Sequence, residues 1–218
     1  MRAVAHLALF ASLSIILVAC GGMVLPGAPG SVLFQDDFAR SSSGWDQRHT
    51  PGSSTEYVDG RYRIAVFRPN TDAWGNPGIH VADVRIEVDV HKMDGPDDNL
   101  FGVICRYQDA GNFYFLVTST DGFSGIGQYI NGQRQLLSGD AMLPIPGIVA
   151  GLPDHHLRAV CDGSQLALYV DSILASQAPA SDWASGDVGL MSGTYREPGT
   201  DIAFDNFSVL RAGGDGPP

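Results

Sequence analysis

The sequence predicts an all-β protein in which two antiparallel sheets pack as a jelly-roll sandwich. Short segments rich in Val, Ile, Phe and Tyr recur along the chain, and Gly, Asn and Asp turn signals separate them. No segment after residue 30 keeps a helical period over about eleven residues. The pattern gives roughly twelve to fourteen short strands, a number typical of two packed sheets.

Residues 1–20 have the features of a bacterial export signal. The apolar run at residues 7–19 is shorter than the ~20 residues of a membrane span and has the length of a signal-peptide core. It ends in LVACG at residues 17–21, which resembles a lipobox, so we expect Cys20 to be lipidated. The alternative is an ordinary secretory signal with a chance cysteine.

The remaining organisation follows from composition. We expect a Gly/Pro linker at residues 21–31, the sandwich at residues 32–210 and a disordered tail at residues 211–218. These features predict a lipid-anchored, extracytoplasmic protein of the bacterial cell envelope. Without Arg2, 12 basic and 24 acidic residues remain, a formal charge of −12. This charge repels phosphate backbones, so nucleic acid is not an expected partner.

The longest strand-like unit is residues 99–133, which the turn signals Asp121-Gly122 and Asn131-Gly132 help to divide into three strands. Two other segments are expected to be loops: residues 68–78, and residues 136–153 with their three prolines. In chain order, the other expected strands are residues 32–38, 55–58, 61–67, 81–90, 156–161, 165–170, 173–177, 187–193 and 201–210.

Two cysteines remain once Cys20 is set aside. Cys105 and Cys161 both lie in expected strands of an exported protein, where disulfides persist, so we predict a bridge between them. Two buried free thiols are the alternative. A catalytic thiol is not expected, because neither cysteine lies in a turn beside a histidine.

Three stretches resemble one type of bacterial exported domain. They are GPDDN through GVICRYQD within residues 95–109, ASGDVGL at residues 184–190 and FDNF at residues 204–207. The chain resembles concanavalin A-like lectin/glucanase domains over residues 32–210, close to laminin-G-like and 3-keto-disaccharide hydrolase-like domains. The resemblance implies a concanavalin A-like sandwich and a carbohydrate-binding role.

One expected strand partly matches a glycosidase motif. Family 16 glycoside hydrolases of this fold use a strand of the form E-x-D-x-(x)-E, and Glu87 and Asp89 match its first two carboxylates. His91 or Lys92 stands where the acid/base glutamate should be. We therefore expect a solvated strand face and no catalytic residue.

No cofactor is expected, although a structural calcium ion is an alternative. Asp36-Asp37 and Asp205-Asn206 could meet if the first and last strands pair, and Asp97-Asp98-Asn99 offers similar oxygen ligands. His155-His156 is not expected to chelate a metal, because neighbouring residues of a regular strand point to opposite faces.

Aromatic residues beside planar polar groups give the best indication of a ligand site, because a sugar's apolar face stacks on Trp or Tyr. Trp45 and Trp183 are weaker candidates, and Trp and Tyr can equally complete a core. Arg106 lies on an otherwise apolar strand, so it either lines a groove or pairs internally. The ligand-binding candidates are Trp74, Arg106, Tyr129 and Tyr195.

We therefore expect the sandwich to bind a glycan or another extracellular ligand without catalysis. Two alternatives are a glycoside-acting enzyme of the 3-keto-disaccharide hydrolase type and a structural envelope module with no sugar site. A groove filled by bulky side chains would favour the last.

Overall fold

The predicted three-strand unit forms antiparallel strands joined by short turns in the computed structural model, which describes residues 27–213. The Asn131-Gly132 turn has a positive φ at both residues, as a type I′ hairpin turn requires. A fourth strand returns after this turn and pairs with the third.

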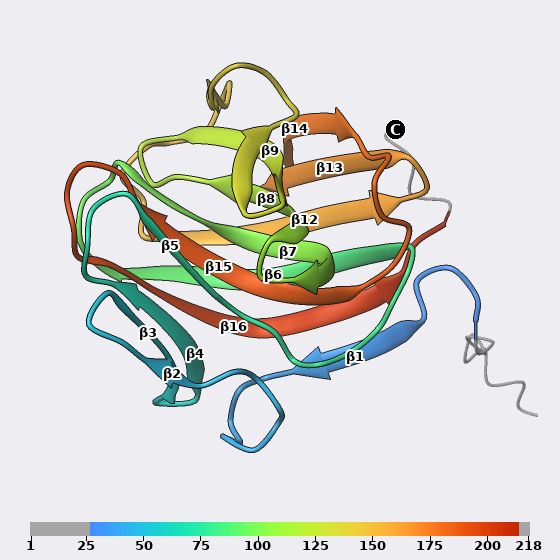
Figure 1. Cartoon of the computed structure of the whole chain (residues 1–218), viewed down its shortest axis with the longest axis horizontal. Helices are drawn as coiled ribbons and strands as arrows, with labels where there is room; N and C mark the ends of the chain where they lie inside the picture. The colour runs from blue at the N-terminus through green and yellow to red at the C-terminus, as the bar shows by residue number, and fades with distance from the viewer. Residues whose placement is uncertain (1–26, 214–218) are drawn as a thin grey trace, which may run out of the picture.

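The described residues form two antiparallel sheets packed face to face, which confirms the predicted all-β sandwich (Figure 1). Sheet A has nine strands and sheet B has seven. No helix in residues 27–213 is long and apolar enough to cross a bilayer.

Sheet A runs in the order β14-β13-β12-β6-β16-β4-β3-β2, with β1 paired to β16. Its strands are β1 (Val32–Asp36), β2 (Arg48–His49), β3 (Ser53–Val58), β4 (Arg61–Val66), β6 (Val84–Asp94), β12 (Asp154–Asp162), β13 (Gln165–Val170), β14 (Ile173–Pro179) and β16 (Thr200–Arg211).

Sheet B runs in the order β10-β9-β8-β7-β15-β5, with β11 paired to β9. Its strands are β5 (Thr71–Gly75), β7 (Asn99–Asp109), β8 (Asn112–Thr118), β9 (Phe123–Ile130), β10 (Gln133–Leu136), β11 (Leu143–Pro144) and β15 (Asp187–Thr194).

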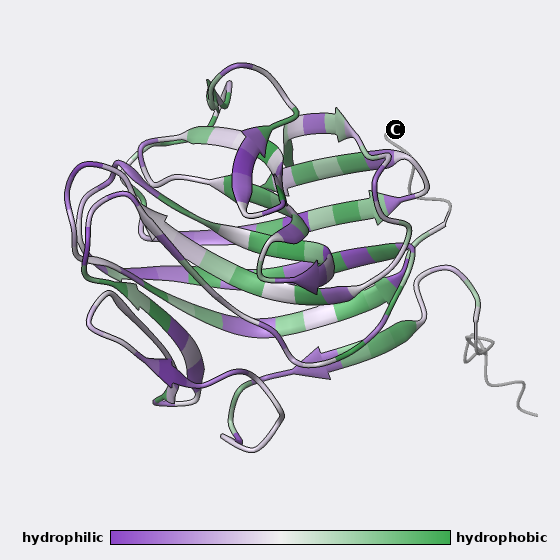
Figure 2. Cartoon of the chain, in the orientation of Figure 1, coloured by the Kyte–Doolittle hydropathy of each residue, from purple (hydrophilic) through white to green (hydrophobic). Residues whose placement is uncertain are grey.

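Alternating side chains build the core between the sheets. On β6, Val84, Ile86, Val88 and Val90 are at most 3% exposed, while the residues between them face outward. Figure 2 shows this alternation as green and purple bands along the strands. Period-2 alternation therefore places one face of each sheet against the other.

A disulfide joins the two sheets. Cys105 of β7 and Cys161 of β12 are bonded and fully buried, which confirms the predicted bridge. It connects positions separated by 56 residues in the sequence.

Two segments differ from the sequence-based expectation. Residues 71–75, expected to be loop, form edge strand β5, which pairs with β15. Their polar composition is typical of a loop, and the sequence does not indicate that Asp72 pairs with Tyr129 on the distant strand β9. Residues 137–153 do carry little regular structure, apart from the two-residue β11.

The two ends of the described chain lie together. Gly30 N–H donates to the Arg211 carbonyl, and Arg211 N–H donates to that of Ser31. Arg211 belongs to β16, and Ala212 N–H bonds to the Asp83 carbonyl, so order extends into the expected tail. The expected export signal at residues 1–20, with Cys20, and residues 214–218 lie outside the described residues.

Candidate functional site

Sheet B is so strongly curled that side chains from strands β5 and β9 meet across one of its faces. Strands β5 and β9 are four positions apart in the sheet, which corresponds to about 19 Å at the usual strand spacing. Nevertheless, the Tyr129 hydroxyl on β9 donates to Asp72 Oδ2 on β5 at 2.6 Å. Gly193 allows this approach, because a Cβ there would collide with the Asp72 carboxylate. The middle of the outer face, the surface of sheet B that points away from sheet A, is therefore covered.

Aromatic rings fill the covered part of this face. The Phe113 ring stacks on Tyr129 with centroids 4.8 Å apart, and the Trp74 ring lies 5.2 Å from Phe113 and 6.0 Å from Tyr129. Phe113 is fully buried, while Trp74 and Tyr129 are partly buried. These rings pack chiefly against one another, as the alternative for aromatic candidates anticipated.

Arg134 on β10 connects this cluster to more open surface. Its guanidinium lies 3.7 Å from the Asp72 carboxylate, donates to the Tyr195 hydroxyl at 3.4 Å and lies 5.1 Å from the centre of the Phe115 ring. Burial lowers the Arg134 pKa, but the Asp72 charge and Tyr195 outweigh it, so the pKa is raised overall. The guanidinium is therefore a fixed positive charge.

The same carboxylate acts on Tyr129. Burial and the neighbouring Asp72 charge both raise the pKa of the Tyr129 phenol. Its hydroxyl stays protonated and keeps donating to Asp72, whose side chain is only 8% exposed. This pair connects strands β5 and β9 across the outer face of sheet B.

A pocket of about 850 Å³ opens beside the aromatic cluster. Tyr195, Leu136 and Met142 give it apolar surface, and the Tyr195 hydroxyl contacts Met142 Sδ at 3.0 Å. We call it the Tyr195 pocket. Its lining residues are Asp98, Ser119, Asp121, Phe123, Arg134, Gln135, Leu136, Gly139, Asp140, Ala141, Met142, Tyr195 and Arg196.

Polar groups are available around this pocket. Within residues 27–213, the Asp98 and Asp140 carboxylates have no hydrogen bond or ion pair, while Asp121 accepts one bond from the Ser119 hydroxyl. Free carboxylate oxygens accept hydrogen bonds from hydroxyl donors. An aromatic ring beside unpaired carboxylates therefore provides surface for a polyhydroxylated ligand.

Three of the four predicted ligand residues share the outer face of sheet B. Trp74, Tyr129 and Tyr195 lie there together, but only Tyr195 lines the pocket. A direct ligand contact by Trp74 or Tyr129 stays a prediction.

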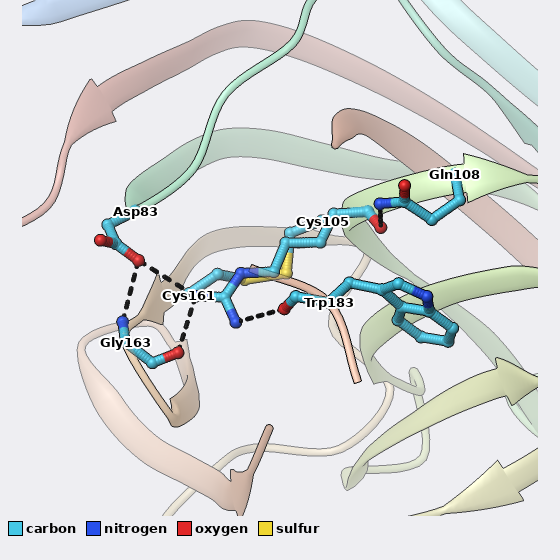
Figure 3. Close-up of a disulfide and its surroundings, with 7 residues drawn as sticks. Asp83, Cys105, Gln108, Cys161, Gly163 and Trp183 are labelled. Carbon is cyan, nitrogen blue, oxygen red and sulfur yellow. Dashed lines mark hydrogen bonds and ion pairs between the residues drawn. A yellow bond between two sulfur atoms is a disulfide. The ribbon is translucent and has the colours of Figure 1, made fainter. Parts of the chain in front are cut away.

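Arg106 is separated from the other three, and its prediction as a ligand residue needs correction. Its side chain is 2% exposed, and its guanidinium donates to the carbonyls of Trp183 and Gly163, both at 2.9 Å, and to Asp83 at 3.1 Å. Figure 3 shows Asp83, Gly163 and Trp183 grouped near the Cys105–Cys161 disulfide. The bulge at Arg106, where φ is 54°, turns its side chain away from the outer face. Of the two roles considered for Arg106, internal pairing is the one observed.

The two weaker candidates also have packing roles. Trp45 is buried in the core and donates from Nε1 to Asp36 Oδ2 at 3.0 Å. The Trp183 ring packs edge-on against Tyr114, with centroids 5.0 Å apart.

The acidic stretches do not form a preformed metal centre. The two carboxylate oxygens of Asp36 accept bonds from Phe38 N–H and Trp45 Nε1–H, and Asp97 pairs with Lys92. No group of three or more His, Cys, Asp or Glu side chains in residues 27–213 is arranged to hold an ion. Calcium binding therefore gains no support from the geometry.

The strand that partly matches the glycosidase motif belongs to sheet A, whereas the Tyr195 pocket lies on sheet B. Glu87, Asp89 and His91 face outward on β6 of sheet A. Glu87 pairs with Arg85, and Asp89 with His156.

Sequence reasoning missed Arg134 and Asp72. The signal for Arg134 was present, because a two-residue turn at Asn131-Gly132 places Arg134 opposite Tyr129. Asp72 gave no comparable signal, since its contact depends on the curl of the sheet.

Comparison with known proteins identifies the fold. No protein-family model and no curated protein matches the chain. Among solved structures, it is similar to the carbohydrate-binding module CBM66 from Bacillus subtilis, with TM-score 0.62, 19% identity and coverage of 77% of this chain and 96% of that one. A protein of unknown function with a galectin-like fold, also from Bacillus subtilis, has TM-score 0.62 and 10% identity over 84% and 97% of the two chains.

An enzyme has a similar sandwich. The GlcNAcα1-4Gal-releasing endo-β-galactosidase from Clostridium perfringens matches with TM-score 0.57 and 10% identity, over 84% of this chain and 63% of that chain. At these identities the likeness shows the fold alone. The fold of this chain is a galectin-like β-sandwich, consistent with the concanavalin A-like class that the sequence resembles.

Proposed function

We propose that this chain is a lipid-anchored, extracytoplasmic protein that binds a glycan in the Tyr195 pocket. The observation that carries the proposal is the pocket itself, which combines a partly exposed tyrosine with unpaired carboxylates on the outer face of sheet B. Its volume of about 850 Å³ lies within the usual range for ligand sites, about 300–1,000 Å³.

The chemistry of the lining fits a sugar. The Tyr195 ring and the Leu136 and Met142 side chains offer apolar contact to sugar C–H groups, while Asp98 and Asp140 can accept bonds from sugar hydroxyls. Arg134 fixes the Tyr195 hydroxyl through its 3.4 Å hydrogen bond. A ring held in this way loses little conformational entropy when a ligand stacks on it.

Binding without turnover is the form of this function that we favour. Glu87 and Asp89, which match the first two carboxylates of the family 16 glycosidase motif, lie on sheet A, away from the pocket. The carbohydrate-binding module among the structural neighbours supports a binding role, while the endo-β-galactosidase keeps glycoside chemistry as the alternative.

Anchoring through Cys20 is part of the same proposal and rests on the LVACG sequence at residues 17–21. A lipidated cysteine there would keep the sandwich at the membrane surface, because each buried CH₂ group contributes about 0.8 kcal/mol to membrane binding. The short linker at residues 21–31 would hold the pocket close to the envelope, where polysaccharides are abundant.

The experiment is a glycan array with the detergent-solubilised full chain, followed by titration of the best ligand. We expect Tyr195→Ala to abolish binding and Phe67→Ala to leave it unchanged. Phe67 is the matched control, because it is a 48% exposed aromatic outside the pocket. Equal affinities for the wild type and Tyr195→Ala would overturn the site assignment. Release of reducing ends from the glycan would show that the protein hydrolyses its ligand and would contradict binding without turnover.

A further inference from the structure

Two histidines on the outward face of sheet A are each oriented by an aspartate. His91 Nδ1 lies 2.6 Å from Asp154 Oδ1, and His156 Nδ1 lies 2.7 Å from Asp89 Oδ1. Both pairs cross the β6–β12 seam, where His91 is opposite Asp154 and His156 is opposite Asp89. The Tyr195 pocket lies on the other sheet, so this cluster belongs to a separate surface.

The hydrogen bonds determine which ring nitrogen is free. An ionised carboxylate only accepts, so Nδ1 of each neutral ring must carry the hydrogen and Nε2 must carry the lone pair. His156 Nδ1 and Asn206 Nδ2 both lie within hydrogen-bond distance of the Asp89 carboxylate, which accepts from both. Asp89 therefore holds the His156 ring in this tautomer.

Asn206 completes the support of Asp89. Its Nδ2 donates to Asp89 Oδ2 at 2.8 Å, so both carboxylate oxygens are occupied. Asn206 has a φ of 52° and lies in a bulge of β16 opposite β6, which directs its amide toward the neighbouring strand. Carboxylate–histidine pairs with the second ring nitrogen free are the usual support of metal-ligating histidines.

The two rings border the same hollow. A depression of about 470 Å³ is lined by both His91 and His156, with Ala203 of β16 opposite His91. In the register, the two histidines are diagonal neighbours on adjacent strands, a separation of about 7–8 Å that long side chains can span. Their side chains are 37% and 49% exposed, so an ion can reach them from solvent.

The local charge favours a cation. Four aspartates line the hollow, against one arginine, Arg61. An anion would meet this excess of negative charge, whereas a divalent cation would be attracted by it. Imidazole nitrogen is a ligand that zinc, copper and nickel prefer, while calcium and magnesium prefer oxygen.

We propose that His91 and His156 bind a divalent transition-metal ion, such as Zn²⁺, through their Nε2 atoms. Because no three metal-ligating side chains are prearranged in residues 27–213, water completes the coordination and the site stays open to solvent. His155 takes no part as a ligand, since its ring is buried, stacks on Phe101 and pairs with Asp171. The pair that can chelate thus comes from two strands, not from adjacent residues.

The test is calorimetric titration of the full chain with Zn²⁺ alone, in detergent and without a histidine tag. We expect one ion per chain, with His91→Gln and His156→Gln each weakening binding at least about 10-fold. Asp154→Asn should weaken it by about 10-fold through the lost ring support. His80→Gln is the matched control, because His80 is hydrogen-bonded to Ser185 away from the hollow, and it should bind as the wild type does.

A measurement on the wild type removes any dependence on how the variants fold. Zn²⁺ should shift the imidazole ¹⁵N resonances of Nε2 in His91 and His156 and leave those of His49 and His80 in place. Acidification should reverse the shifts, because protonation of Nε2 competes with the metal. No saturable binding at millimolar Zn²⁺, or unchanged affinity in the His91→Gln/His156→Gln double variant, would overturn the proposal.

Discussion

Loss of the Cys105–Cys161 disulfide is expected to destabilise the sandwich strongly. The bridge connects β7 of sheet B to β12 of sheet A and closes a loop across 56 residues. In the chain-entropy model, opening a loop of that length lowers the free energy of unfolding by about 4 kcal/mol. Both cysteines are fully buried, so replacing them with alanine also removes packed sulfur atoms.

Urea denaturation measures this effect. The oxidised wild type should be compared with the same protein reduced by a phosphine and with the Cys105→Ala/Cys161→Ala variant. For an m value of about 2.5 kcal/mol/M, a loss of about 4 kcal/mol lowers the midpoint by about 1.6 M. The alanine variant should be at least as destabilised as the reduced protein. A midpoint shift below about 0.4 M in both would contradict a stabilising role for the bridge, because the bridge would then contribute less than about 1 kcal/mol.

Three further predictions test other parts of the account. Arg106→Met should lower the free energy of unfolding, measured in urea, by about 3 kcal/mol, because two buried carbonyls lose their hydrogen-bond donor. Glycan affinity should stay unchanged. A large loss of affinity in a stable variant would show that Arg106 does contribute to the ligand site. Burial raises the pKa of Tyr62 and Tyr129. The stability that these two protonated phenols contribute is therefore fully present below the unfolded tyrosine pKa of about 10 and is lost as the pH rises above it. Ultraviolet titration of all seven tyrosines near that pH, with the fold intact, would contradict this. Cys20→Ser should abolish lipid labelling and release the protein from the membrane fraction; labelling equal to that of the wild type would exclude the lipobox.

Local patterns predicted the fold because they report directly on local geometry. Alternation along residues 84–90 indicated which side chains enter the core, and Asn131-Gly132 indicated a hairpin turn. The disulfide was predicted because export was expected and because Cys105 and Cys161 both lie in expected strands. Strand β5 was missed, because Thr71 and Asp72 look like loop residues until β15 and Tyr129 provide their partners.

The site was only partly predictable, because it depends on the curl of sheet B. Tyr195 was identified by residue type, but its separation from Trp74 follows from the contact between Asp72 and Tyr129. Arg106 showed the limit of reasoning from alternation, since a bulge reverses the direction of its side chain. Long-range curvature and bulges leave little trace in a single sequence.

The most direct measurement for the central claim is a map of backbone amide chemical-shift changes on adding the best glycan from the array. A glycan bound in the Tyr195 pocket should change the shifts of Arg134, Leu136, Met142 and Tyr195 and none on the outward face of sheet A. Perturbations confined to sheet A, or none at saturating glycan, would contradict a glycan site in the Tyr195 pocket.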